Sequence, residues 1–139
     1  MLRVVIDTNV IVAALRSRLG ASFALLQRLG MGVFEHVVTV PLVMEYEDVL
    51  LRPGMVPVPA DAVQDVIDYL CTTGAAQAVH FLWRPLLPDP KDDMVLEAAM
   101  CAGCPWIITF NTRDFAAAAG LGVTAVKPGA FLRLLESQQ

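Results

Sequence analysis

Acidic side chains recur in this sequence where an apolar run ends or a helical segment begins. Asp7 and Asp114 each follow a run of β-branched and apolar residues. Glu45 lies one turn into a predicted helix, and Asp93 opens another. Two carboxylates about 4 Å apart repel by about 4 kcal/mol at an effective dielectric constant of about 20. Several of them at one rim would need protonation or a bound cation, so these residues predict a cation site.

The ligand chemistry of such a site favours Mg²⁺ or Mn²⁺ over Zn²⁺, because the candidate ligands are oxygens without a nearby Cys or His. An acidic cage around one or two such ions suits phosphodiester hydrolysis by activated water. The net charge is −4, from 10 basic and 14 acidic residues. That balance argues against a general nucleic-acid coat protein, whose pI usually exceeds about 9. Bound cations would still allow an acidic chain to handle a polyanion.

Each acid also has a simpler structural interpretation. Asp7 and Asp114 could cap helices, and Asp93 with its neighbour Asp92 could complement a helix dipole. Glu45 could be a solvated helix residue. The recurrence of acids at equivalent places in the predicted topology favours a shared site over four independent roles.

Predicted strands and helices alternate along the whole chain. Strands are expected at residues 2–6, 37–40, 78–82, 106–110 and 123–126, and helices at 10–15, 21–29, 42–51, 61–70, 92–100, 112–119 and 129–135. This alternation is typical of an α/β fold with a central, mostly parallel five-stranded sheet and helices on both faces. Sites in such folds lie at the carboxyl ends of the strands, near the point where the strand order reverses.

Length and composition predict one soluble domain over residues 1–139. The chain is 56% hydrophobic and 17% charged, and this apolar excess predicts a buried self-interface in a homodimer. The longest stretches without a charged residue, 69–83 and 98–112, are shorter than the ~18–20 residues of a membrane-spanning helix. Three cysteines and the absence of a secretion signal lead us to expect a reducing, cytoplasmic location.

Four motifs in order resemble those of PIN-domain nucleases. They are residues 5–10 (VIDTNV), 42–50 (LVMEYEDVL), 93–99 (DMVLEAA) and 109–115 (TFNTRDF). The similarity extends from residue 3 to about 127. The short chain and residues 47–53 (EDVLLRP) further resemble the VapC-like bacterial toxins of toxin–antitoxin pairs.

The resemblance implies a PIN-like three-layer fold and a Mg²⁺- or Mn²⁺-dependent endoribonuclease. It also implies a homodimer that a small cognate antitoxin holds inactive. The catalytic acids carried over from the motifs are Asp7, Glu45, Asp93 and Asp114. Of these, Asp7, Asp93 and Asp114 would bind the metal.

Neighbouring polar residues take supporting roles in this resemblance. Asn9 and Thr109 would orient the acids or waters through hydrogen bonds. Asn111 stands where many relatives carry another acid, and Asp92 or Asp89 could compensate for that loss.

Two cations flank the proposed acids and are the candidates for contact with RNA phosphates. These are Lys91 and Arg113. The sequence leaves open whether Glu45 or Glu47 faces the site, because residues two apart cannot share one helix face. It also leaves open whether one or two ions bind.

Other functions remain as alternatives. A haloacid-dehalogenase-like phosphatase also places an Asp after its first strand, but it requires a second Asp where this chain has Asn9. A non-enzymatic phosphorelay receiver would account for Thr109 and for Lys127–Pro128, but no acceptor Asp ends the expected third strand. A PIN fold without activity could serve only as an antitoxin-binding module.

Overall fold

A five-stranded parallel sheet forms the centre of the computed structural model, which describes residues 1–79, 87 and 89–138 without the side chains of Pro90 and Lys91. The strand order is β3-β2-β1-β4-β5, and each neighbouring pair is parallel. The strands are β1 (Leu2–Ile6), β2 (Phe34–Val38), β3 (Ala75–Ala76), β4 (Trp106–Ile108) and β5 (Thr124–Val126).

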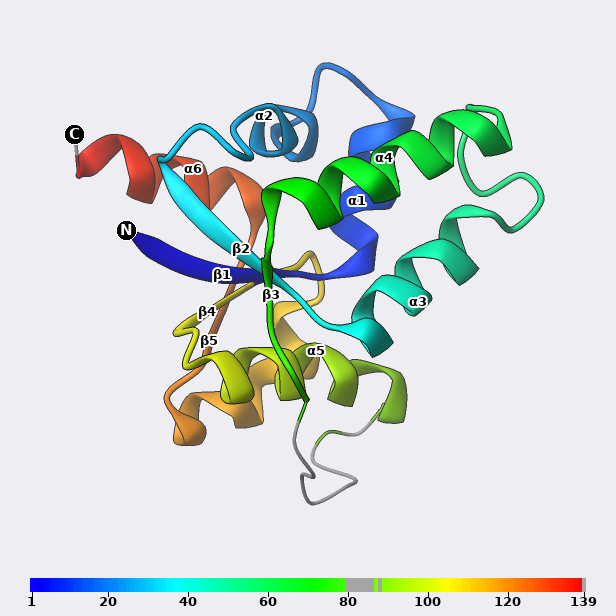
Figure 1. Ribbon diagram of the computed structural model, residues 1–139. Helices are drawn as coiled ribbons and strands as arrows, with labels where there is room; N and C mark the ends of the chain where they lie inside the picture. Colours follow the sequence, from blue (N-terminus) through cyan, green and yellow to red (C-terminus); the bar gives the residue numbers. More distant parts are fainter. Residues whose placement is uncertain (80–86, 88, 139) are drawn as a thin grey trace.

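Helices cover both faces of this sheet and make three layers (Figure 1). They are α1 (Thr8–Arg16), α2 (Ala21–Gln27), α3 (Val40–Leu50), α4 (Ala60–Thr73), α5 (Pro90–Ala102), the 3₁₀ helix η1 (Thr112–Leu121) and α6 (Pro128–Ser137). The chain builds outward from β1 to β3 and then crosses back to β4. Right-handed crossovers therefore place α1, α2 and α4 on one face and α5 and η1 on the other. The predicted α/β fold with a central parallel sheet is confirmed.

The central strands are apolar because both of their faces are covered. Val4, Val5 and Ile6 of β1 are fully buried, as are Ile107 and Ile108 of β4. Strands in parallel sheets read as continuous hydrophobic runs for this reason. Burying each such side chain contributes about 1.5–3 kcal/mol, so the middle of the sheet is a rigid base for the residues at its edge.

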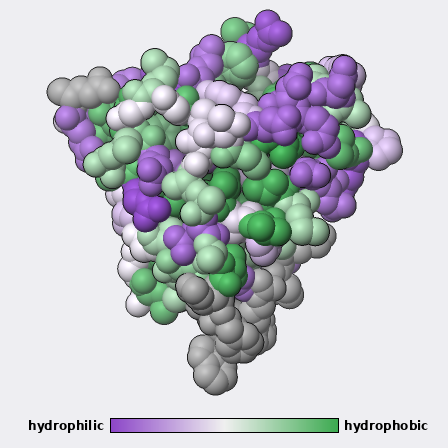
Figure 2. Space-filling model, in the orientation of Figure 1, coloured by the Kyte–Doolittle hydropathy of each residue, from purple (hydrophilic) through white to green (hydrophobic). Residues whose placement is uncertain are grey.

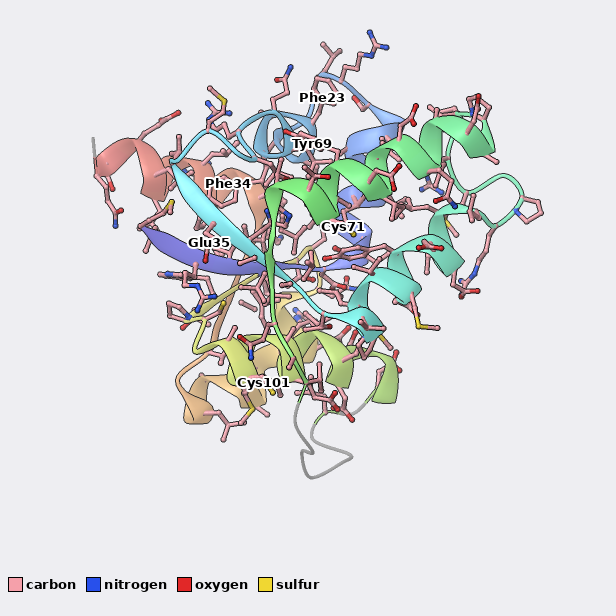
Figure 3. The ribbon with its side chains drawn as sticks, in the orientation of Figure 1. Phe23, Phe34, Glu35, Tyr69, Cys71 and Cys101 are labelled. Atoms are coloured by element: carbon pink, nitrogen blue, oxygen red, sulfur yellow. The ribbon has the colours of Figure 1, made fainter. Side chains whose placement is uncertain are left out.

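Side chains from the helices fix the outer elements to this base. The Tyr69 hydroxyl of α4 lies within hydrogen-bonding distance of the carbonyls of Leu26 (3.0 Å) and Leu29 (3.1 Å), which holds α4 against the end of α2 (Figure 3). On β2, the Phe34 ring packs edge-on against Phe131 of α6, with centroids 5.3 Å apart. Both contacts join elements that are distant in sequence.

A buried histidine joins α4 to β2. His36 Nε2 donates to the Leu70 carbonyl at 2.8 Å. A Cβ on Gly74, the residue that ends α4, would lie 2.7 Å from that nitrogen. Only glycine therefore fits at this position, and it lets the chain turn directly into β3.

The third strand differs from the prediction of residues 78–82. β3 is only Ala75–Ala76, paired with Val37 and Val38. The next backbone amide, that of Gln77, donates to the Val38 carbonyl at 2.9 Å, and residues 80–82 lie outside the described part. Of the residues expected to form this strand, Ala78 and Val79 lie outside any strand, and the strand that pairs with β2 instead begins directly after α4.

The start of α3 also differs from the expectation. Residues 37–40 were predicted as a strand, but β2 ends at Val38 and Thr39 caps α3 by accepting from the Leu42 amide at 3.2 Å. A threonine hydroxyl satisfies an otherwise unpaired helix amide, so the helix begins at Val40.

Within the described residues, no single helix is long and apolar enough to cross a bilayer. The helices α1 and α2 reach the required length and composition only as a pair bent by 101°.

Candidate metal-dependent nuclease site

The candidate site lies where the strand order reverses, between β1 and β4. Ile6 and Ile108 are paired in register, and the next residue of each strand, Asp7 and Thr109, leaves the sheet at the same edge. The Asp7 amide still donates to the Ile108 carbonyl at 2.9 Å. From this point the chain connects to β2 on one side of β1, while β4 occupies the other. This is the position at which open α/β sheets bind ligands.

Asp7 is held in one orientation by a hydrogen bond to each carboxylate oxygen. Oδ1 accepts from the Thr8 amide at 2.8 Å, and Oδ2 accepts from the Thr109 hydroxyl at 2.7 Å. Burial raises the pKa of Asp7, these two hydrogen bonds lower it, and the charges of Glu45 and Asp114 raise it again. The side chain is 8% exposed. A buried carboxylate facing like charges is well placed to accept a cation.

Thr109 connects Asp7 to the neighbouring loop. Its hydroxyl oxygen accepts from the Asn111 amide at 3.0 Å and lies 3.3 Å from Asn9 Nδ2. Asn9 Oδ1 in turn accepts from the Phe110 amide at 3.3 Å. Asn9 and Thr109 therefore join the start of α1 to the segment that follows β4.

Tyr46 fixes α3 to the same strand end. Its buried hydroxyl donates to the Ile6 carbonyl, immediately before Asp7. Burial also raises the pKa of Tyr46 well above its ordinary value, so the phenol stays protonated and remains a donor. This contact sets the position of Glu45, the preceding residue.

An acidic cleft of about 290 Å³ opens at this point. It is lined by Asp7, Thr8, Asn9, Val12, Glu45, Val49, Met55, Asp89, Asp92, Val95 and Asn111. Four of these residues are acids, and they come from three different parts of the chain. The cleft thus gathers carboxylates that the sequence separates by up to 85 positions, from Asp7 to Asp92.

The adjacent acids Asp92 and Asp93 face different surroundings. Asp93 is fully buried, and its Oδ1 accepts from the Leu87 amide at 3.0 Å. Asp92 lines the cleft, and its Oδ2 is buried without a hydrogen-bond partner among the described residues. Burial, followed by the charges of Asp7 and Asp89, raises the pKa of Asp92 to about 6. Of these two acids, Asp92 lines the cleft and Asp93 is enclosed by the protein.

The other predicted acids differ in how closely they approach the cleft. Glu45 lines it, whereas Glu47 lines a separate hollow beside Cys71. Asp114 lines a hollow next to the cleft, and its charge raises the pKa of Asp7 and of Asp92. Glu45 is therefore the glutamate on the side of the site, and Asp114 stands at its margin.

Of the two residues predicted to contact RNA, the structure describes the side chain of only Arg113. Arg113 is exposed and lines the same hollow as Asp114. Lys91 lies in α5, but its side chain is outside the described part. The hollow also contains Lys127 and Phe110, which sequence reasoning did not assign to an RNA site. The available indication was an aromatic residue next to the polar residues 111–114.

The residues fit a hard divalent cation. Among residues 1–79, 87 and 89–138, no three His, Cys, Asp or Glu side chains form a group that would hold an ion by themselves. Mg²⁺ is commonly held by one or two carboxylates, with waters and substrate phosphates completing its coordination. The unpaired Asp92 Oδ2 and the carboxylate of Asp7 supply that kind of donor set.

Comparison with known proteins identifies the class. Residues 3–113 match the family model of the PIN domain, so the chain belongs to the PIN-domain family. A search of curated protein sequences gives no significant match. The family part of the sequence-based expectation is confirmed.

Two solved structures are similar in fold. VapBC2 from Rickettsia felis, bound to a DNA fragment from its promoter, has a chain that superposes with a TM-score of 0.60 at 10% identity, over 91% of this chain and 98% of that one. FitAB bound to an IR36 DNA fragment has a chain that superposes with a TM-score of 0.58 at 16% identity, over 90% of this chain and 94% of that one. At these identities the similarity establishes the PIN fold.

Proposed function

We propose that this PIN-domain protein is a divalent-metal-dependent endoribonuclease. The observation that carries the proposal is the acidic cleft at the reversal of the strand order, where Asp7 is oriented by two hydrogen bonds and Asp92 Oδ2 is buried and unpaired. A structural cap would leave no unpaired buried carboxylate oxygen, because such groups are costly unless they have a partner.

The roles of the residues follow from their positions. Asp7 and Asp92 would hold the ion, and Glu45 contributes negative charge beside them. A bound Mg²⁺ or Mn²⁺ would supply a Lewis acid and lower the pKa of the attacking water. Thr109 donates a hydrogen bond to Asp7, which fixes the orientation of that carboxylate and lowers its pKa against the effect of burial. Asp114 strengthens the attraction for cations from the margin.

Cleavage of single-stranded RNA in Mn²⁺ tests this proposal. We expect the protein to cut RNA with Mn²⁺ or Mg²⁺ and to lose that activity when EDTA removes the ion. Asp48→Asn is a control for the loss of an acidic side chain and should leave cleavage unchanged, because Asp48 is an exposed acid on α3 paired with Arg52 at 2.8 Å. Full activity in EDTA would exclude the metal mechanism.

We further propose that the protein is the toxin of a toxin–antitoxin pair and acts in the cytoplasm. Residues 47–53 resemble VapC-like toxins, and the similar structures are of the assemblies VapBC2 and FitAB bound to DNA. The partner would be a small cognate antitoxin. Induced expression of the chain alone should arrest growth, and Asp7→Asn should relieve the arrest; growth arrest by both forms would contradict this role.

A homodimer is the expected assembly. An apolar hollow of about 620 Å³ lies at the end of β2 and the start of α3, where Val40 is 73% and Met44 64% exposed. Figure 2 shows hydrophobic atoms gathered over this region. Packing of these apolar side chains against a second copy of the chain would remove them from water. Light scattering at about 20–50 μM, above the Kd of a typical stable dimer, should give twice the chain mass, and a monomeric mass would contradict the dimer.

The alternative functions have less support. The receiver needs an acceptor acid after the third strand, but β3 ends at Ala76 and is followed by Gln77. The phosphatase needs an acid two residues after Asp7, and the side chain of Asn9 is instead engaged with Thr109 and the Phe110 amide.

A further inference from the structure

A hollow with two cations lies directly beside the acidic cleft. It measures about 260 Å³ and is lined by Phe110, Asn111, Thr112, Arg113, Asp114 and Lys127. Asn111 also lines the acidic cleft, so the two spaces share a wall. This arrangement puts positive charge next to the place where carboxylates gather.

The two cations in this hollow are available to a ligand. Arg113 and Lys127 are both exposed, and neither forms an ion pair with any residue that the structure describes. They come from different elements, η1 and the residue that precedes α6. Asp114 is the acid in the hollow, and its charge acts on Asp7 and Asp92 across the shared wall.

Phe110 adds an aromatic surface to the same hollow. Its side chain is 42% exposed, which leaves apolar area in water at a free-energy cost. Its backbone is fixed nonetheless, because its amide donates to Asn9 and the Asn111 amide donates to Thr109. An exposed ring on a fixed loop beside unpaired cations is the combination that binds single-stranded nucleic acid.

We propose that this hollow binds the nucleotide next to the scissile phosphate of single-stranded RNA. Arg113 and Lys127 contact its phosphate, and Phe110 stacks on its base. The inference rests on the proposed nuclease function and deepens it. The acidic cleft alone would repel a polyanion, and the adjacent cations offset this repulsion while setting the direction in which the strand crosses the site.

Nucleotide binding without cleavage gives the first test. We would titrate the metal-free protein with uridine 5′-monophosphate, inorganic phosphate and uridine, and follow the backbone amides of Phe110, Arg113 and Lys127 by NMR. The nucleotide should cause saturable shifts there and bind more tightly than phosphate or uridine. Absence of these shifts, or equal affinity for phosphate and nucleotide, would overturn the proposed site.

Variants separate the two kinds of contact. Arg113→Gln and Lys127→Gln should each weaken binding of both nucleotide and phosphate. Phe110→Ala should weaken nucleotide binding about fivefold or more, the loss expected for one stacked base, and leave phosphate binding unchanged. The matched control is Arg18→Gln, because Arg18 lies beyond the far end of α1, whose nine residues span about 14 Å. Equal losses in the control would overturn the assignment.

Cleavage kinetics give the second test. With Mn²⁺ and a six-nucleotide RNA, Arg113→Gln and Lys127→Gln should raise KM and leave kcat close to that of the parent protein. The slope of log affinity against log salt should fall by about 0.7 for each phosphate contact removed. An unchanged KM in both variants would overturn the inference. If the parent cuts no RNA but binds the nucleotide in the hollow, the nuclease proposal fails and the nucleotide site is supported.

Discussion

The two ends of strand β1 carry opposite kinds of electrostatics. At its amino end, Arg3 Nε lies 2.8 Å from Glu35, and the Arg3 guanidinium also donates to the Ala102 carbonyl. The charges there are matched. At the carboxyl end, Asp7 faces further acids, and the cations Arg113 and Lys127 line the adjacent hollow.

This difference separates structural charges from functional ones. A paired charge such as Arg3–Glu35 joins neighbouring strands and leaves little uncompensated electrostatic potential. Burial, together with the charges of neighbouring acids, raises the pKa of Asp92 to about 6. Ionised Asp92 therefore lowers the stability of the metal-free protein, and groups with such shifts gather at functional sites. The carboxyl end of β1 is therefore the end at which we propose the functional site.

Removing the oriented acid should give the largest effect. Asp7→Asn keeps the side-chain size but removes a charged ligand, so we expect RNA cleavage in Mn²⁺ to fall by about 100-fold or more. Glu35→Gln at the opposite end of the sheet is the control and should cut RNA at the parent rate. Similar rates for Asp7→Asn and the parent would remove the functional distinction between the two ends.

Truncating Asp93 should mainly cost stability. Asp93→Ala leaves the Leu87 amide buried without its acceptor, so the free energy of unfolding should fall by about 1–3 kcal/mol. Urea denaturation of the metal-free protein measures this loss. A stability equal to that of the parent, together with a loss of Mn²⁺ binding, would return Asp93 to the metal site.

The pH dependence of stability should identify Asp92. Its folded pKa of about 6 lies above the ordinary 3.8, so between these values the folded state binds more protons than the unfolded state. Stability of the metal-free protein should therefore fall as the pH rises from about 4 to about 6. Asp92→Asn should flatten this part of the profile of unfolding free energy against pH. The change should be less than about 1 kcal/mol after solvent screening, and thermal melts across the pH range measure it. An unchanged profile would contradict the assigned environment.

Breaking the charge pair at the amino end should have the smallest effect. Glu35→Gln removes the partner of Arg3, and both side chains are about one-third exposed, at 33% and 37%. Exposed pairs contribute about 0.2–1 kcal/mol, so we expect a loss in this range that shrinks at high salt. A loss of several kcal/mol would show that this end is electrostatically strained as well.

The sequence predicted the parts of the molecule that depend on local pattern. The alternation of apolar runs and amphipathic segments was enough for the parallel sheet, and the residue after the first strand marked Asp7. The strand Ala75–Ala76 was missed because two alanines carry no β pattern, and the pairing with β2 alone defines them. Tertiary contacts override local propensity in such short edge strands.

The sequence could not predict which of two adjacent acids in α5 lines the cleft. Asp92 and Asp93 are adjacent, so they point about 100° apart around the helix, and only the rotation of α5 decides which one reaches the cleft. That rotation follows from the burial of Leu96 and Glu97 against the rest of the fold. By contrast, the choice of Glu45 over Glu47 follows from Tyr46, whose hydroxyl is anchored to the Ile6 carbonyl.

Under the proposed function, the shared wall formed by Asn111 imposes a trade-off between metal binding and RNA binding. A neutral amide there borders both a space that attracts cations and a space that attracts anions. An acid at this position would raise the affinity for a divalent ion and at the same time lower the affinity for a phosphate. Metal affinity and substrate affinity would thus be coupled through one side chain, and asparagine at this position would lower the affinity for metal and raise the affinity for phosphate.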